Sequence, residues 1–140
     1  MLVGLPGSGK STYVDRLGGT ALSSDELRRL LSDDPTNQSI HHRVFSVLRG
    51  LLKHRLELGR PVTYIDATNL TPQERRPYIK LADLYDCGIE AVFFDVSVAE
   101  CQRRNRERNR IVPDDVIAKM AELLVPPSVE EGFSLVTVAR

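Results

Sequence analysis

The feature that most constrains the fold is the run Gly-Leu-Pro-Gly-Ser-Gly-Lys-Ser-Thr at residues 4–12. It fits the Walker A pattern Gly-x-x-x-x-Gly-Lys-Ser/Thr at every fixed position. An apolar stretch, Met1–Val3, precedes the run, and an amphipathic segment, Lys10–Leu17, follows it. This context predicts a strand, a phosphate-binding P-loop and a helix whose N-terminus faces the phosphates. The alternative, a glycine-rich turn that binds nothing, is disfavoured by the complete match.

The residue types of this loop suit a nucleoside triphosphate. Glycines allow backbone angles that a Cβ would forbid, so successive N–H groups can surround an anion. Lys10 is expected at the β- and γ-phosphates, and the Ser11 hydroxyl is expected to ligate Mg²⁺. The predicted nucleotide-binding residues of the loop are Gly7, Ser8, Gly9, Lys10, Ser11 and Thr12. The motif does not say what becomes of the γ-phosphate.

The rest of the chain alternates between strand-like and helix-like segments. Strands are expected near residues 1–3, 20–22, 62–66, 91–96 and 135–138, and helices near residues 10–17, 25–31, 39–58, 71–86, 98–108 and 113–124. This order predicts one doubly wound α/β domain over residues 1–140, with about five parallel strands and helices on both faces of the sheet. Ligands of such sheets bind at the carboxyl ends of the strands.

Composition restricts the function further. The 140 residues carry equal numbers of acidic and basic side chains, so no global field indicates a nucleic-acid partner, and such a surface would have to be local. The two cysteines, Cys87 and Cys101, provide neither zinc-site spacing nor a disulfide framework, and both are expected to be small buried residues. The absence of a long apolar run and of a signal peptide predicts a cytoplasmic protein without a membrane partner.

Asp25 follows the second predicted strand, and Arg28 lies three residues later. An Asp at the start of a helix usually caps it. However, Ser23 and Glu26 have the spacing of a capping box, which would leave Asp25 inside the first turn and able to face the ligand edge of the sheet. There a carboxylate could accept the proton of an attacking hydroxyl. Spacing leaves both roles open for Asp25. The simplest interpretation of Arg28 is a solvated helix face or an ion pair with Asp25.

An arginine-rich run covers residues 101–110, where Arg104 and Arg108 are four positions apart and share a helix face. One interpretation is a solvated helix end; the favoured one is a lid, at about residues 104–113, that closes over a polyphosphate. The Asn109–Val112 segment is expected to end the helix.

Asp66 ends the third predicted strand, where it is either a turn residue or a carboxylate that holds Mg²⁺ through a bridging water. The histidines His41, His42 and His54 are expected at the surface or at an edge. A guanine-recognition motif is absent, which argues against a GTP switch.

Four segments in this order, Gly4–Thr12, Ser24–Arg28, Asp66–Asn69 and Arg104–Arg108, resemble the polynucleotide 5′-hydroxyl kinase family. The similarity extends to Phe133 and is greatest to the kinase module of bacterial RNA end-healing enzymes. The P-loop alone is shared by many ATPases, whereas the four segments together are more specific. The resemblance implies a P-loop NTPase fold of kinase type with an arginine-rich lid.

The resemblance also implies roles for individual residues. Asp25 would be the general base for a 5′-hydroxyl, and Arg28 would hold the phosphate of the acceptor's terminal nucleotide. Arg104 and Arg108 would be lid arginines on ATP. Together with Lys10, the residues Asp25, Arg28 and Arg108 form the predicted catalytic set, and ATP and Mg²⁺ are the implied cofactors.

We therefore expect an ATP-dependent polynucleotide 5′-kinase that acts on RNA or DNA ends, in RNA repair. The alternatives are a P-loop kinase of a small molecule or tRNA-linked acceptor, and a nucleotide-binding ATPase module. The related kinases are often fused to a phosphatase or ligase module, which these 140 residues do not contain. The chain is thus expected to be an excised domain or a stand-alone kinase, with a fused or associated end-healing module as a partner.

Overall fold

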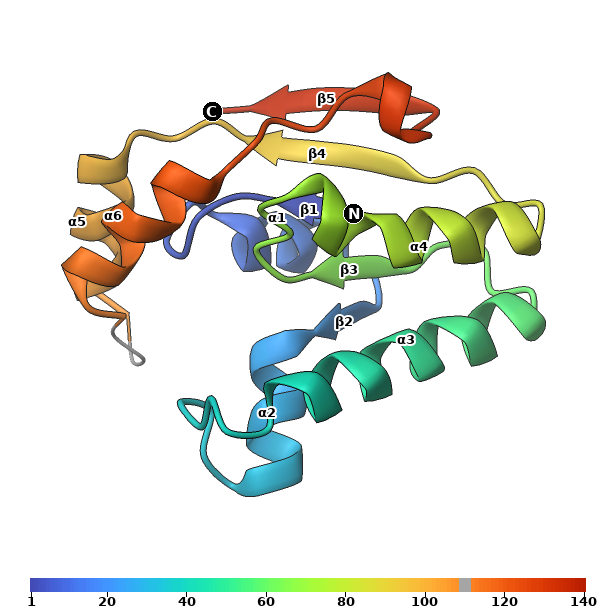
Figure 1. The fold of residues 1–140 in the computed structure, drawn as a ribbon, viewed down its shortest axis with the longest axis horizontal. Coiled ribbons are helices and arrows are strands. Elements are labelled where there is room, and N and C mark those ends of the chain that lie inside the picture. Colours follow the sequence, from blue (N-terminus) through green and yellow to red (C-terminus); the bar gives the residue numbers. More distant parts are fainter. Residues whose placement is uncertain (109–111) are drawn as a thin grey trace.

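A computed structural model describes residues 1–108 and 112–140 (Figure 1). Its strands are β1 (Leu2–Val3), β2 (Ala21–Ser23), β3 (Tyr64–Asp66), β4 (Glu90–Phe94) and β5 (Leu135–Ala139). Its helices are α1 (Lys10–Leu17), α2 (Ser24–Ser32), α3 (His41–Glu57), α4 (Pro72–Leu84), α5 (Val98–Arg106) and α6 (Asp114–Leu123), with a 3₁₀ turn, η1 (Val129–Glu131). The predicted alternation of strands and helices is confirmed.

The strands form two parallel ladders, β1-β4-β5 and β2-β3. Just beyond them, the Gly4 amide donates a hydrogen bond of 3.0 Å to the Thr68 carbonyl, which places β1 beside β3. The resulting order is β2-β3-β1-β4-β5, in agreement with the expected sheet of about five parallel strands. In this order β1 and β3 leave the sheet at the same edge, so the P-loop and the segment after Asp66 lie next to each other.

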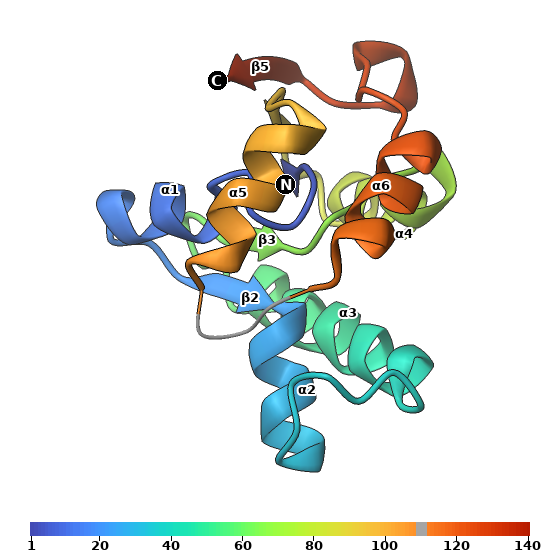
Figure 2. The ribbon, with the colours of Figure 1, turned by 90° about the vertical axis from the view of Figure 1, so that its left-hand side faces the viewer.

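Helices cover both faces of the strands, as predicted. In Figure 2, α1 lies on one side of the sheet and α3 and α4 lie on the other. Alternation along the strands explains this arrangement, since Val3 and Phe93 pack with Leu48 of α3, whereas Leu2 and Phe94 pack with Val14 of α1. A separate cluster of Leu5, Leu70, Cys101 and Ile117 seats α5 and α6 above the P-loop.

Helix ends follow the sequence signals closely. Gly18 takes the left-handed conformation (φ 66°) after α1, and Thr71 caps α4 by accepting a hydrogen bond from the Glu74 amide. Helix α5, which was predicted to reach about residue 108, ends at Arg106. The break was predicted at Asn109–Val112, and residues 109–111 of that segment lie outside the described part of the chain. The η1 turn was not expected.

Two further expectations concern the cysteines and the membrane. Cys101 is buried, as predicted, but Cys87 is exposed, because it lies in the connection between the turn after α4 and β4. Within the described residues, no helix is both long and apolar enough to cross a bilayer.

Candidate active site

The P-loop is shaped by glycines that no other residue could replace without movement. Gly7 has φ 83° and Gly9 has φ 103°, both in the left-handed region. A Cβ on Gly7 would lie 2.4 Å from the Cys101 carbonyl oxygen, so the loop passes directly against α5. A Cβ on Gly4 would lie 2.6 Å from Ser8 Oγ. The loop is therefore folded tightly between β1 and the base of α5.

Lys10 and Ser8 point into this loop. The Lys10 ammonium donates to the carbonyl oxygens of Gly4 at 3.0 Å and Leu5 at 2.9 Å. Burial lowers the pKa of Lys10 to about 8, an effect that the carboxylate of Asp66 opposes. Ser8 Oγ is buried and has no hydrogen-bond partner among the described residues. A buried cation beside an unsatisfied hydroxyl, at the N-terminus of α1, fits an anionic ligand such as a triphosphate.

Ser11 and Asp66 meet at the edge of the sheet, where the Ser11 hydroxyl donates a hydrogen bond of 2.8 Å to Asp66 Oδ2. Asp66 is 9% exposed. A hydroxyl and a carboxylate side by side are oxygen ligands of the kind that Mg²⁺ prefers, and this ion commonly binds one or two protein oxygens while it keeps several waters. The described residues hold no cluster of three or more His, Cys, Asp or Glu that could cage a metal alone. The pair thus fits a Mg²⁺ ion shared with phosphate oxygens.

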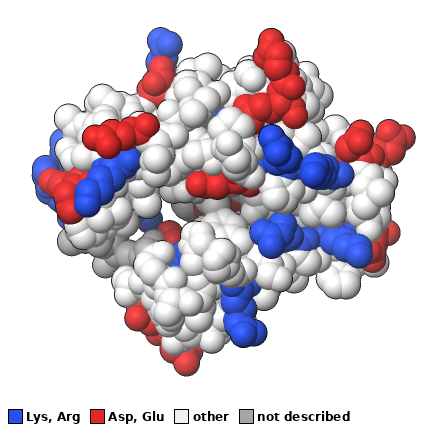
Figure 3. Space-filling model, in the orientation of Figure 1, with Lys and Arg blue, Asp and Glu red and all other residues white. Residues whose placement is uncertain are grey.

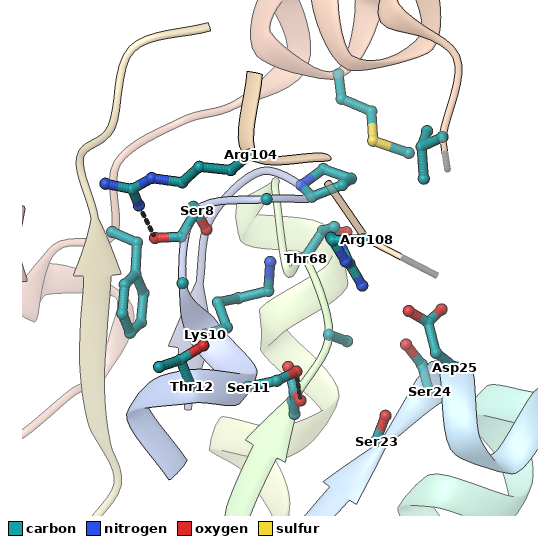
Figure 4. A pocket seen from close by; sticks show the side chains of 18 of the residues that line it. Ser8, Lys10, Ser11, Thr12, Ser23, Ser24, Asp25, Thr68, Arg104 and Arg108 are labelled. Atoms are coloured by element: carbon teal, nitrogen blue, oxygen red, sulfur yellow. Dashed lines mark hydrogen bonds between the residues drawn. The ribbon is translucent and has the colours of Figure 1, made fainter. Parts of the chain in front are cut away.

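At the start of α2, the residue that caps the helix is Ser23 and not Asp25. Ser23 Oγ accepts a hydrogen bond of 3.2 Å from the Glu26 amide, so Ser23 caps the helix. Asp25 lies in the first turn, half-exposed, and lines the cleft that also contains Lys10. Figure 4 shows its carboxylate directed into the space between α2 and the P-loop, on the side where the Arg108 side chain lies. The cap alternative for Asp25 therefore does not describe this helix.

Arg28 is a buried cation beside Asp25. It is 4% exposed, and its guanidinium lies 3.6 Å from the Asp25 carboxylate and 3.4 Å from His41 Nδ1. His41 is exposed, as expected for a surface or edge residue, and so are His42 and His54. Its ring also lines the cleft and packs on Phe45, with the two centroids 4.8 Å apart. Burial, followed by the Arg28 and His42 charges, lowers the pKa of His41, which favours the neutral ring that can accept from Arg28.

The sequence interpretation missed this half of the cleft. Thr36, Gln38, His41 and Phe45 all line it, from the α2–α3 loop and the first turns of α3. The available signal was the four-residue spacing of His41 and Phe45, which places both rings on one helix face.

Arg104, from α5, and Arg108, just after it, both line the cleft. Arg104 donates to Glu100 at 2.9 Å and reaches the Ser8 carbonyl at 3.4 Å, so it bridges α5 and the P-loop (Figure 4). The run is less self-repelling than its composition suggests, because Glu100 pairs with both Arg103 and Arg104, and these bonds lower the pKa of Glu100 to about 2. Of the expected lid, residues 109–111 lie outside the described chain.

One cleft of about 1170 Å³ brings these groups together. Its lining includes every residue that the sequence singled out for catalysis, nucleotide binding or metal binding: Gly7, Ser8, Gly9, Lys10, Ser11, Thr12, Asp25, Arg28, Asp66, Arg104 and Arg108. Chemically, the cleft has an anion cradle at one side, a carboxylate and a buried guanidinium at the other, and arginines above. Asp25 and Arg108, which are 83 positions apart in the sequence, therefore share one solvent-accessible space.

The sequence matches a known protein family over most of its length. A family model described as an AAA domain matches residues 1–127. The chain belongs to this family.

Two solved structures are similar to this chain in fold. It is similar to a gluconokinase from Sinorhizobium meliloti 1021, with a TM-score of 0.64 and 19% identity over 98% of this chain and 78% of that chain. It is also similar to the APS kinase of Mycobacterium tuberculosis in complex with AMPPNP and APS, with a TM-score of 0.63 and 18% identity over 98% of this chain and 85% of that chain. The AAA-domain protein thus has the α/β P-loop kinase fold. Neither structure is a polynucleotide kinase, so the narrower resemblance stays a prediction.

Proposed function

We propose that the protein is an ATP-dependent phosphotransferase that moves the γ-phosphate onto a hydroxyl group bound beside Asp25. The observation on which this rests is that Asp25, released from capping by Ser23, lines the same cleft as Lys10 of the P-loop. A nucleotide-binding ATPase module would need the P-loop but not a carboxylate and a buried guanidinium facing it. AMPPNP in the similar APS kinase complex supports a nucleotide donor at this loop.

The residues divide the reaction between them. The P-loop amides and Lys10 hold the donor phosphates, and Mg²⁺, held through Ser11 and Asp66, would neutralise charge on them. The Asp25 carboxylate accepts the proton of the acceptor hydroxyl, and the hydroxyl oxygen forms a bond to the γ-phosphorus. At the same time the bond between the γ-phosphorus and the β–γ bridging oxygen breaks, and ADP leaves. Arg104 and Arg108 stabilise the charge that develops on the transferred group and help to exclude water.

Arg28 indicates the kind of acceptor. A guanidinium that is 4% exposed, next to the proposed base, suits a substrate that carries an anionic group near its reactive hydroxyl. A small anionic molecule is the acceptor class that the comparisons favour, since the two similar structures are a gluconokinase and an APS kinase.

A second candidate acceptor is the 5′-hydroxyl end of RNA or DNA. The observation that favours it is the joint placement of the four family-like segments around one cleft, with Arg28 where a terminal nucleotide's phosphate would need a partner. In this case the protein would act as a polynucleotide 5′-kinase in RNA repair, as the sequence resemblance implies. A tRNA-linked acceptor would use the same groups.

The experiment is an acceptor panel with γ-labelled ATP and Mg²⁺. The panel contains sugar acids, nucleosides, nucleoside 3′-monophosphates, and 5′-hydroxyl RNA and DNA oligonucleotides. We expect label on an acceptor that carries an anionic group, and we expect the Arg28→Met variant to raise the KM for that acceptor far more than the KM for ATP. ATP hydrolysis that no acceptor stimulates, with unchanged rate in Asp25→Ala, would refute phosphotransfer and favour the ATPase module.

A further inference from the structure

A basic surface runs along α3 and α4, away from the cleft. Figure 3 shows two groups of blue side chains facing each other where α3 and α4 cross the right-hand half of the molecule. On α4 the exposed cations are Arg76 and Lys80, because Arg75 is fully buried. Helix α3 carries the exposed Arg43 and Lys53 and the half-buried Arg49 and Arg55. Of these, Arg49 and Lys53 are four residues apart. We name Arg49, Lys53, Arg76 and Lys80 the α3–α4 seam.

Helix periodicity explains why the cations gather here. Arg49 and Lys53, like Arg76 and Lys80, are four residues apart, so each pair lies on one face of its helix, about 6 Å apart along the axis. The helices pack against each other, with Tyr78 of α4 buried in the shared core with Leu48 and Leu52 of α3. Burial raises the pKa of Tyr78 to about 12, and the Arg49 charge opposes this shift.

The seam stands out because the whole chain has no net charge. Of its four cations, Lys53 has a weak ion pair, at 4.0 Å from Glu57, and this pair lies at the far end of α3. Figure 3 shows acidic side chains at the two ends of the seam and basic ones between them. The positive charge is thus concentrated locally, as in a surface for an anionic partner.

The N-terminal end of α3, eight residues before Arg49, reaches the candidate active site, although the four seam residues do not line the cleft. The first turns of α3 line the cleft through His41 and Phe45, and α4 starts just after the strand that ends in Asp66. From there both helices run in the same direction, side by side, to the opposite end of the molecule (Figure 1). A long anionic molecule with one end beside Arg28 would therefore meet the seam with its following segments.

We propose that the α3–α4 seam binds the sugar–phosphate backbone of a single-stranded nucleic acid whose 5′ end occupies the cleft. This proposal rests on the polynucleotide candidate of the proposed function and extends it to several nucleotides beyond the end. Each helix carries two cations one turn apart, and α3 leads from the cleft to its pair, which fits a strand that enters the cleft by its end. An anionic membrane surface is the alternative partner for these cations, but a membrane has no chain end that could enter the cleft.

The test uses a 5′-hydroxyl thymidine 20-mer with a 3′ fluorophore, whose binding is followed by anisotropy without ATP from 50 to 300 mM salt. The test variant is Arg76→Gln/Lys80→Gln, and Lys53→Gln is a second variant on the other helix. The matched control, Arg29→Gln/Lys119→Gln, removes two exposed charges from α2 and α6. The same proteins are assayed for transfer to the 20-mer and to thymidine 3′-monophosphate, and for binding to vesicles with 30% phosphatidylserine.

We expect the α4 double variant to bind the 20-mer roughly tenfold more weakly at about 0.1 M salt, with a salt slope shallower by about 1.4, because each lost phosphate contact removes about 0.7 from the slope. Lys53→Gln should have about half the effect on the slope, and the control variant none. Transfer to the 20-mer should lose a similar factor in kcat/KM, whereas transfer to thymidine 3′-monophosphate should not change.

Equal binding by wild type and double variant, or an equal loss in the control, would overturn the proposal. So would a loss of vesicle binding with unchanged 20-mer binding, which would assign the seam to a membrane.

The seam proposal and the proposed kinase activity can fail independently of each other. Seam-dependent binding without any transfer to the 20-mer would refute the polynucleotide kinase activity alone, and transfer with identical kinetics in both variants would refute the seam alone.

Discussion

At the scale of single residues, Lys10 is a P-loop group whose protonation the fold changes strongly. It is 8% exposed, and burial lowers its pKa to about 8, from an ordinary value of 10.5. A triphosphate in the P-loop would bring opposite charge to the ammonium and raise its pKa again. Nucleotide binding is thus coupled to the uptake of a proton above pH 8.

The resulting prediction is that the Kd for ATP rises as pH increases from 8 to 9.5, by up to roughly tenfold per pH unit. Titration calorimetry in two buffers of different ionisation enthalpy measures both the affinity and the proton uptake. In Lys10→Arg, binding is weaker but flat over this range, because a guanidinium stays charged. A wild-type Kd that stays constant between pH 8 and 9.5, with no proton uptake, would contradict the coupling.

In the nucleotide-free protein, the lowered pKa of Lys10 makes the free energy of unfolding rise with pH, whereas it makes ATP binding weaker. Between pH 8 and 10.5 the unfolded chain still binds the proton of Lys10 and the folded chain does not, so this group's contribution to the free energy of unfolding rises with pH in that window.

At the scale of elements, α4 and η1 are joined by a buried ion pair. Arg75 is fully buried and donates to Glu131 at 2.8 Å and 3.0 Å, while its remaining nitrogen donates to the carbonyls of Asn69 and Val125. Glu131 also caps η1 through the Ser128 amide. The pair therefore ties the C-terminal segment to the loop that follows Asp66, on which the proposed Mg²⁺ site depends.

We predict that Arg75→Met lowers the free energy of unfolding by about 3–5 kcal/mol, because it leaves a carboxylate buried without its partner. Urea unfolding followed by circular dichroism measures the loss. The double variant Arg75→Met/Glu131→Met should be more stable than Arg75→Met alone, since it removes the orphaned charge as well. A single variant within about 1 kcal/mol of wild type would show that the pair is not a structural link.

At the scale of the whole molecule, what could be predicted from the sequence was local. The P-loop, the alternation of strands and helices, and the Ser23 cap depend on neighbours within a few residues, and the structure matches each of them. What was missed depends on contacts across the chain. His41 lines the cleft because the α2–α3 loop returns it to Arg28, and Cys87 is exposed because a turn carries it out of the core.

The arginine-rich run illustrates an intermediate case. The sequence left a solvated helix end and a lid as interpretations of it. In the structure Glu100, at three- and four-residue spacing, pairs with Arg103 and Arg104. Glu100 was visible in the sequence, but only the fold shows that Arg104 also reaches the Ser8 carbonyl.

The most direct measurement of the central claim is single-turnover phosphoryl transfer by Asp25→Asn, a near-isosteric change, with the Kd for ATP measured on the same preparation. If Asp25 accepts the acceptor's proton across the cleft, the transfer rate at saturating ATP falls by about 10²–10⁴-fold while the Kd for ATP changes by less than about threefold. If Asp25→Asn transfers phosphate within about threefold of the wild-type rate, the Asp25 carboxylate is not the general base, and the proposed mechanism of phosphotransfer is wrong.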